Sequence, residues 1–114
     1  MTEISGNKVR GHLETMILSV LEAGGGHGFE IVKRLSDRGC GLLNLKEGTV
    51  YPVLYRLESS GLLKSEWEEG DSGRRGPRRR IYTLTRKGRK QLSAGREQWT
   101  QFVSIVGNIV GATA

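Results

Sequence analysis

Residues 49–84 read TVYPVLYRLESSGLLKSEWEEGDSGRRGPRRRIYTL, and this segment decides which fold the sequence predicts. Its first third predicts a helix, because the apolar residues recur at the spacing of one buried face, at Val50, Val53, Leu54 and Leu57. Pro52 lacks a backbone N–H and is tolerated only near a helix start, so the helix begins around Gly48 or Thr49. Gly61 stands where a left-handed cap ends the helix.

A two-stranded ribbon is expected after this helix. Residues 63–68 alternate apolar or small side chains with charged ones, which is typical of a half-exposed strand. Residues 79–84 are rich in Ile, Tyr and Thr and predict the returning strand, with the turn-rich residues 70–77 between the two. Trp67 is expected in the strand core or as a cover over the hairpin.

Three further helices are predicted. The first spans residues 9–23, with apolar residues on one stripe at Val9, Leu13, Met16, Ile17, Val20 and Leu21. The second runs from about Gly28 to Asp37, and the fourth follows Thr85, a good N-cap, to about Val110.

This order of helix, helix, helix, hairpin and helix predicts a mainly α fold with a β-hairpin. We expect a winged helix-turn-helix DNA-binding domain in residues 1–84 and a C-terminal dimerisation helix in residues 85–114, together one compact unit. In such a fold the third helix enters the major groove of DNA and the hairpin lies along the backbone or in the minor groove.

The charge distribution indicates an anionic partner. The 114 residues include 18 Lys and Arg against 12 Asp and Glu, a net charge of +6. Residues 73–90 hold nine of the basic residues and no acid, so the rest of the chain has 9 basic against 12 acidic residues. A basic hairpin tip suits the phosphates of duplex DNA, although a charge run can also be only a solvated loop.

Other classes of function find no support in the sequence. The single Cys40 cannot form an internal disulfide, so a reduced, cytoplasmic setting is expected. The two histidines and one cysteine lack metal-ligand spacing, and no apolar run approaches the ~20 residues of a membrane span. We expect no cofactor, no metal and no enzyme activity, since neither a nucleophile–base pair nor a phosphate-binding glycine loop is suggested.

Several segments resemble the PadR family of bacterial transcriptional regulators. They are RGHLE (residues 10–14), HGFEI (27–31), EGTVYPVLYRLE (47–58), GLL (61–63), GRR (73–75) and YTLTRKG (82–88). The segment at 47–58 is specific to that family, whereas YTLTRKG occurs in many winged helices. The resemblance implies a homodimeric repressor of inverted-repeat operators, in the short subgroup with a single C-terminal helix. Some relatives release DNA when a small aromatic or hydrophobic molecule binds.

The expected DNA contacts come from the third helix and the hairpin. They are Lys46, Thr49, Tyr51, Arg56, Arg74, Arg75, Arg78, Arg79 and Arg80. Two alternatives stay open. Tyr51 and Tyr55, which both lie away from the buried face, could pack only on the hairpin or the first helix, and Arg56 could pair with Glu58 or Glu22. His27 is expected to be structural, near a helix start.

The fourth helix carries an apolar stripe with heptad-like spacing, which predicts a dimer interface with help from the first helix. The expected interface residues are Leu13, Ile17, Trp99, Phe102, Val103, Val106, Ile109 and Val110. Packing on the first helix of the same chain is the alternative. Trp99 is also a candidate for stacking a flat aromatic ligand. The rival function is a winged-helix module that binds protein or RNA without operator selectivity.

Overall fold

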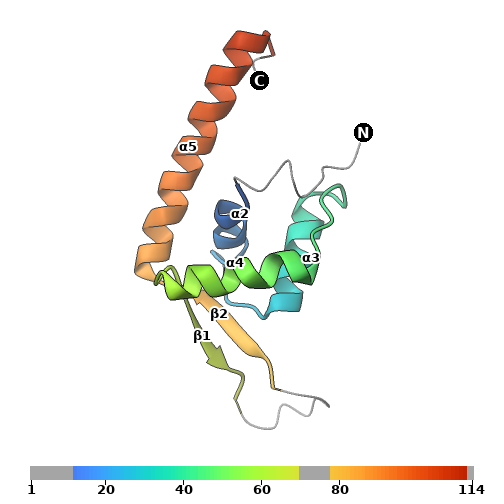
Figure 1. Ribbon diagram of the computed structural model, residues 1–114, viewed down its shortest axis with the longest axis vertical. Coiled ribbons are helices and arrows are strands. Elements are labelled where there is room, and N and C mark those ends of the chain that lie inside the picture. Colours follow the sequence, from blue (N-terminus) through green and yellow to red (C-terminus); the bar gives the residue numbers. More distant parts are fainter. Residues whose placement is uncertain (1–11, 70–77, 113–114) are drawn as a thin grey trace.

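A computed structural model describes residues 12–69 and 78–112. The elements, in chain order, are α2 (Leu13–Val20), α3 (Gly28–Arg38), α4 (Glu47–Ser59), β1 (Leu63–Trp67), β2 (Arg80–Leu84) and α5 (Arg86–Val110). Three helices followed by an antiparallel hairpin and a long helix confirm the predicted winged helix-turn-helix (Figure 1). Helix α4 begins at Glu47, just before the predicted start, so Pro52 lies in its second turn.

The core lies between α2, α3, α4 and the inner end of the hairpin. The apolar residues predicted for α4 are all buried, with Val50 and Leu54 at 0% exposure. Leu13 and Ile17 of α2 are also buried, at 4% and 0% exposure, inside the single chain. These two residues were expected in a dimer interface. Their burial corrects that expectation, because the chain's own core covers the side chains that a partner would need.

Gly61 turns the chain sharply from α4 into the hairpin. Its φ is 78°, the left-handed conformation that glycine adopts without strain. The Leu62 amide donates to the Leu57 carbonyl at 2.9 Å and the Gly61 amide donates to the Glu58 carbonyl at 3.0 Å. This Schellman-type cap confirms the predicted end of the helix and places the hairpin beside α4.

The hairpin is attached to the helices at its inner end. Strands β1 and β2 pair with Leu63 opposite Leu84 and Trp67 opposite Arg80. Leu63 is 2% exposed, but Trp67, four residues along the same face, is 53% exposed. Trp67 therefore does not form strand core, because the ribbon projects beyond the helices before reaching it (Figure 1). Its ring instead stacks beneath the Arg80 guanidinium, 5.1 Å from the ring centroid.

Two glycines let α5 approach the rest of the chain closely. The Thr85 hydroxyl accepts a hydrogen bond from the Gly88 amide at 3.0 Å, which confirms the predicted N-cap. A methyl group on Gly88 would overlap the Leu62 carbonyl oxygen, and one on Gly95 would overlap the Thr15 side chain. The carboxyl-terminal half of α5 then projects away from the other helices (Figure 1). No helix within the described ranges has the length and apolarity of a membrane span.

Candidate nucleic-acid interface

Helix α4 turns its outer face away from the core. With 3.6 residues per turn, the positions opposite the buried Val50 and Leu54 are Gly48, Pro52, Tyr55 and Ser59, and all four are exposed. Tyr55 is 56% exposed and is the largest side chain on this face. It is absent from the predicted DNA contacts, although the periodicity of the apolar residues already placed it outward.

Lys46 and Thr49 lie at the start of α4 and are both exposed. Lys46 is the N-cap residue, and its carbonyl accepts hydrogen bonds from the Thr49 and Val50 amides at 2.9 and 3.1 Å. Its side chain makes no capping hydrogen bond. Because the amino end of a helix carries partial positive charge, both side chains are placed where an anion is favoured.

Tyr51 lies on the side of α4 that faces α3. Its ring fills the space beside Gly28, where an added methyl group would overlap the phenol. Burial raises the pKa of the Tyr51 hydroxyl, and the nearby Glu47 and Tyr55 add to the effect. The hydroxyl is therefore a neutral donor at physiological pH. Packing on α3 differs from the alternative considered above, which was packing on the hairpin or the first helix.

Arg56 forms an ion pair within the chain, with a partner that the sequence did not indicate. Its Nε lies 2.8 Å from Glu14 Oε1 on α2. The two acids considered as partners are engaged elsewhere: Glu58 pairs with Arg80 and Glu22 pairs with Arg96. Arg56 thus joins α4 to α2, with 58% of its side chain still exposed.

The described wing arginines all have partners in the chain. Arg80 donates to Ser65 Oγ at 2.6 Å, pairs with Glu58 at 3.5 Å and covers Trp67. Arg78 donates twice to the Glu68 carbonyl, at 3.2 and 3.1 Å.

Arg79 is held from the other side of the hairpin, where its Nη1 lies 2.8 Å from His27 Nε2. The remaining two predicted contacts, Arg74 and Arg75, lie outside the described residues.

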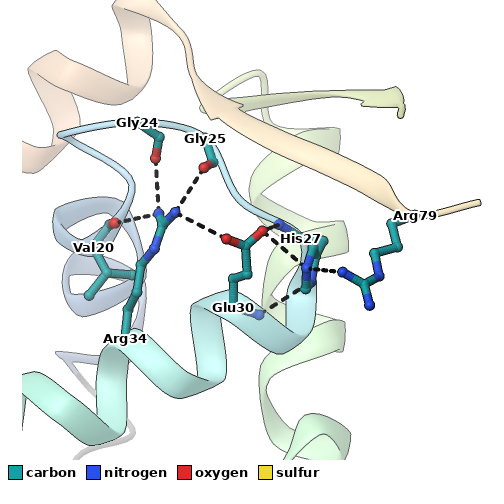
Figure 2. A network of polar contacts seen from close by, with 7 residues as sticks. All are labelled: Val20, Gly24, Gly25, His27, Glu30, Arg34 and Arg79. Carbon is teal, nitrogen blue, oxygen red and sulfur yellow. Dashed lines mark hydrogen bonds and ion pairs between the residues drawn. The ribbon is translucent and has the colours of Figure 1, made fainter. Parts of the chain in front are cut away.

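His27 is the N-cap of α3, as expected for a histidine near a helix start. Its backbone amide donates to Glu30 Oε1 at 3.2 Å, and the Glu30 amide donates to the ring Nδ1 at 3.3 Å. Arg34 extends this network to the carbonyls of Val20, Gly24 and Gly25 (Figure 2). The spacing His-x-x-Glu before an apolar run is a capping-box pattern and is visible in the sequence.

A second surface lies on the projecting part of α5. The face that is buried at Gly88, Leu92 and Gly95 continues along the helix as a row of large apolar side chains. The exposed ones are Trp99, Phe102, Ile105, Val106, Ile109 and Val110, with exposures between 39% and 79%, and Val103 beside them is half-buried.

Aromatic contacts tie the inner end of this row to the start of α2. The His12 ring lies edge-on to Trp99 with centroids 4.9 Å apart, and Phe102 stacks on Trp99 at 6.0 Å. Trp99 therefore contacts two rings of its own chain, and 48% of the residue remains exposed. Among the described residues, no group of three or more His, Cys, Asp or Glu side chains is placed to hold a metal ion.

Comparison with known proteins gives consistent results. A model of the "Transcriptional regulator PadR-like family" matches residues 17–94. A transcriptional regulator from Clostridium thermocellum has a similar structure, with a TM-score of 0.82 and 31% identity over 92% of this chain and 99% of that one. A PadR family regulator from Eggerthella lenta gives 0.78 and 35% over 91% and 86%. Transcriptional regulator Rv3488 of Mycobacterium tuberculosis is 40% identical over 70 residues, 61% of this chain and 59% of that protein.

Proposed function

Because this chain belongs to the transcriptional regulator PadR-like family, whose members are DNA-binding regulators and not enzymes, we propose that it is a homodimeric repressor of an inverted-repeat operator. The observation that carries the proposal is the pairing of two surfaces. One is the outward face of α4 beside a basic wing. The other is the bare apolar face of α5, which a second copy of the chain would cover.

In this proposal α4 reads the DNA sequence. Thr49, Pro52 and Tyr55 enter the major groove, and Lys46 contacts a flanking phosphate. The Thr49 hydroxyl can hydrogen-bond a base edge, and the Pro52 and Tyr55 rings offer apolar contact to a thymine methyl group. Tyr51 and Arg56 support α4 from its flanks, since one packs on α3 and the other pairs with α2.

The dimer is proposed to form along α5. Apolar side chains at Phe102, Val106 and Ile109 follow steps of four and three residues, which is the spacing of two helices that pack along each other. Residues 1–84 would then bind DNA and residues 85–114 would hold the two copies together. A small aromatic ligand that stacks on Trp99 at this interface would be placed to release the DNA.

Selection of bound duplexes from a random pool tests this function. We expect an inverted-repeat consensus whose half-site centres are about one helical turn, ~34 Å, apart. Repeating the selection with flat aromatic compounds tests ligand release. A pool that yields no consensus favours the rival function, a winged-helix module that binds protein or RNA.

Thr49→Val is expected to lower the preference for the selected operator over random DNA up to about tenfold, because one lost hydrogen bond costs about 0.5–1.5 kcal/mol and about 1.4 kcal/mol is a factor of ten. The change keeps the side-chain shape and removes only the hydroxyl. Fluorescence anisotropy on both duplexes measures the ratio. Thr100→Val on α5, where the hydroxyl bonds within its own helix, is the matched control. Equal losses on both duplexes for Thr49→Val would remove Thr49 from the reading role.

Neutralising Arg74, Arg75 and Arg78 to glutamine is expected to weaken binding to operator and random DNA alike, because phosphate contacts carry no direct sequence information. Each lost phosphate contact should reduce the slope of log K against log salt by about 0.9. Binding titrations at several salt concentrations between 50 and 200 mM measure this slope. The control is Arg96→Gln, which removes a charge on α5 that is paired with Glu22, just after α2. An unchanged slope in the triple variant contradicts a wing–phosphate contact.

A further inference from the structure

Arg79 is the residue directly before β2, in the hairpin that forms the wing. At this point the Glu68 amide donates to the Arg79 carbonyl at 2.7 Å, which joins the two arms of the hairpin. The Arg79 side chain does not extend along the ribbon. It crosses to the amino end of α3, where Nη1 lies 2.8 Å from His27 Nε2 (Figure 2).

The His27 ring is itself fixed by α3. His27 is 8% exposed, and Glu30 caps its backbone amide and also places Oε1 3.1 Å from the ring Nε2. Glu30 is in turn 3.7 Å from Arg34, which donates to the carbonyls of Val20 at the end of α2 and of Gly24 and Gly25 after it. The ring nitrogen that meets Arg79 is therefore part of a network anchored on two helices. The donor and acceptor roles at this contact depend on the ring tautomer, because Nδ1 also faces the Glu30 amide at 3.3 Å. In the tautomer with the ring proton on Nδ1, the guanidinium donates a charge-assisted hydrogen bond to Nε2.

This contact is the second of two attachments between the hairpin and the segment before α3. The first is a backbone bridge, in which the Gly26 amide donates to the Tyr82 carbonyl at 3.0 Å and the Tyr82 amide donates back at 2.9 Å. Glu58 of α4 also holds the hairpin, through its ion pair with Arg80. The link from His27 to Arg79, three residues nearer the tip than Tyr82, adds an attachment of the hairpin to the start of α3.

We propose that His27 is a positioning residue for DNA binding, which fixes the direction of the wing through Arg79. The Arg79 guanidinium then serves this link, while other wing arginines contact phosphate. The inference adds to the proposed function and rests on one part of it, the contact between the wing and DNA.

The link is tested first in the free protein. His27→Asn keeps an excellent N-cap residue on α3, but its shorter side chain cannot reach Arg79. The matched pair Arg79→Gln and Arg78→Gln removes the same charge from adjacent residues, only one of which contacts His27. We expect the His27 ring ¹⁵N shifts to move in Arg79→Gln and to stay in Arg78→Gln. Amide exchange of β2 should accelerate in both His27→Asn and Arg79→Gln. Unmoved ring shifts, or unchanged exchange with melting temperatures intact, overturn the proposal whether or not the protein binds DNA.

A double-mutant cycle then tests the consequence for DNA. His27→Asn and Arg79→Gln are each expected to weaken binding about tenfold, and the double variant no further, since coupled neighbours are non-additive on this scale. His27→Asn combined with Arg78→Gln should be additive. Additive losses for His27 and Arg79, or a loss for Arg79→Gln with none for His27→Asn, would assign Arg79 to DNA and overturn the positioning role. If the unaltered chain binds no DNA, the proposed function fails, and the free-protein measurements still decide the link.

Discussion

Phe102→Asp combined with Ile109→Asp is expected to convert the proposed dimer to a monomer. The two side chains are 50% and 79% exposed in the single chain and lie seven residues apart on the bare face of α5. Burying each in a dimer contributes roughly 1.5–3 kcal/mol, and a carboxylate at either position also has to be desolvated. The dissociation constant should therefore rise at least about a thousandfold, since each 1.4 kcal/mol is a factor of about ten. Sedimentation equilibrium should give the single-chain mass of 12.6 kDa.

The helix offers a matched control one residue earlier in each case. Gln101 and Asn108 have the same spacing as Phe102 and Ile109, are exposed, and lie about 100° around α5 from them. Changing both to aspartate adds the same charges to the same helix, and the dimer should persist. A dimer that survives the apolar-face changes would place the interface elsewhere. Operator affinity should fall with the dimer, while the circular dichroism of the monomer stays that of the folded domain.

Gly88→Ala is expected to lower the free energy of unfolding by about 3 kcal/mol, the upper end of the cost of overpacking. An added Cβ would overlap the Leu62 carbonyl oxygen and lie 3.1 Å from Leu84 Cδ2. A backbone carbonyl cannot turn aside as a side chain can, so the start of α5 has to move away from the hairpin. Alanine gains up to about 1 kcal/mol of helix propensity over glycine, which is too little to offset the overlap.

Denaturant unfolding at one fixed protein concentration measures this effect, because the stability of a dimer depends on concentration. Gly24→Ala is the control. Nothing lies within 4 Å of a Cβ there, and the Gly24 carbonyl keeps its hydrogen bond from Arg34. Its stability should change by less than about 0.5 kcal/mol, as for surface sites without special contacts. A Gly88→Ala variant as stable as the control would show that α5 can move away at no cost.

The pattern of local signals predicted much of the fold. Apolar spacing placed Val50 and Leu54 inward on α4, and Gly61 and Thr85 were identified as caps from their residue types and positions. These features depend on the helix period and on hydrogen bonds between residues two to five apart. Of the two places expected for Trp67, strand core is excluded and a position on the outer hairpin remains, for a complementary reason. Alternation shows which face of a strand a residue occupies, but not how far along the strand the helices reach.

The candidate site was predicted less completely, because its long polar side chains contact residues that are distant in the sequence. Arg56 meets Glu14 across 42 residues of sequence, and Arg79 meets His27 across 52. Tyr51 packs beside Gly28 only because α3 and α4 cross there.

By itself, then, the sequence determined the order of the elements, their buried faces, the basic wing and the family. Each of these depends on residue type and on spacing between residues close in the sequence. Only the tertiary structure decided which arginines are held inside the chain and which apolar residues the core covers. It also left the apolar face of α5 exposed, because that depends on how the helices pack. Leu13 and Phe102 had equal claims to an interface in the sequence, and packing buried the first and exposed the second.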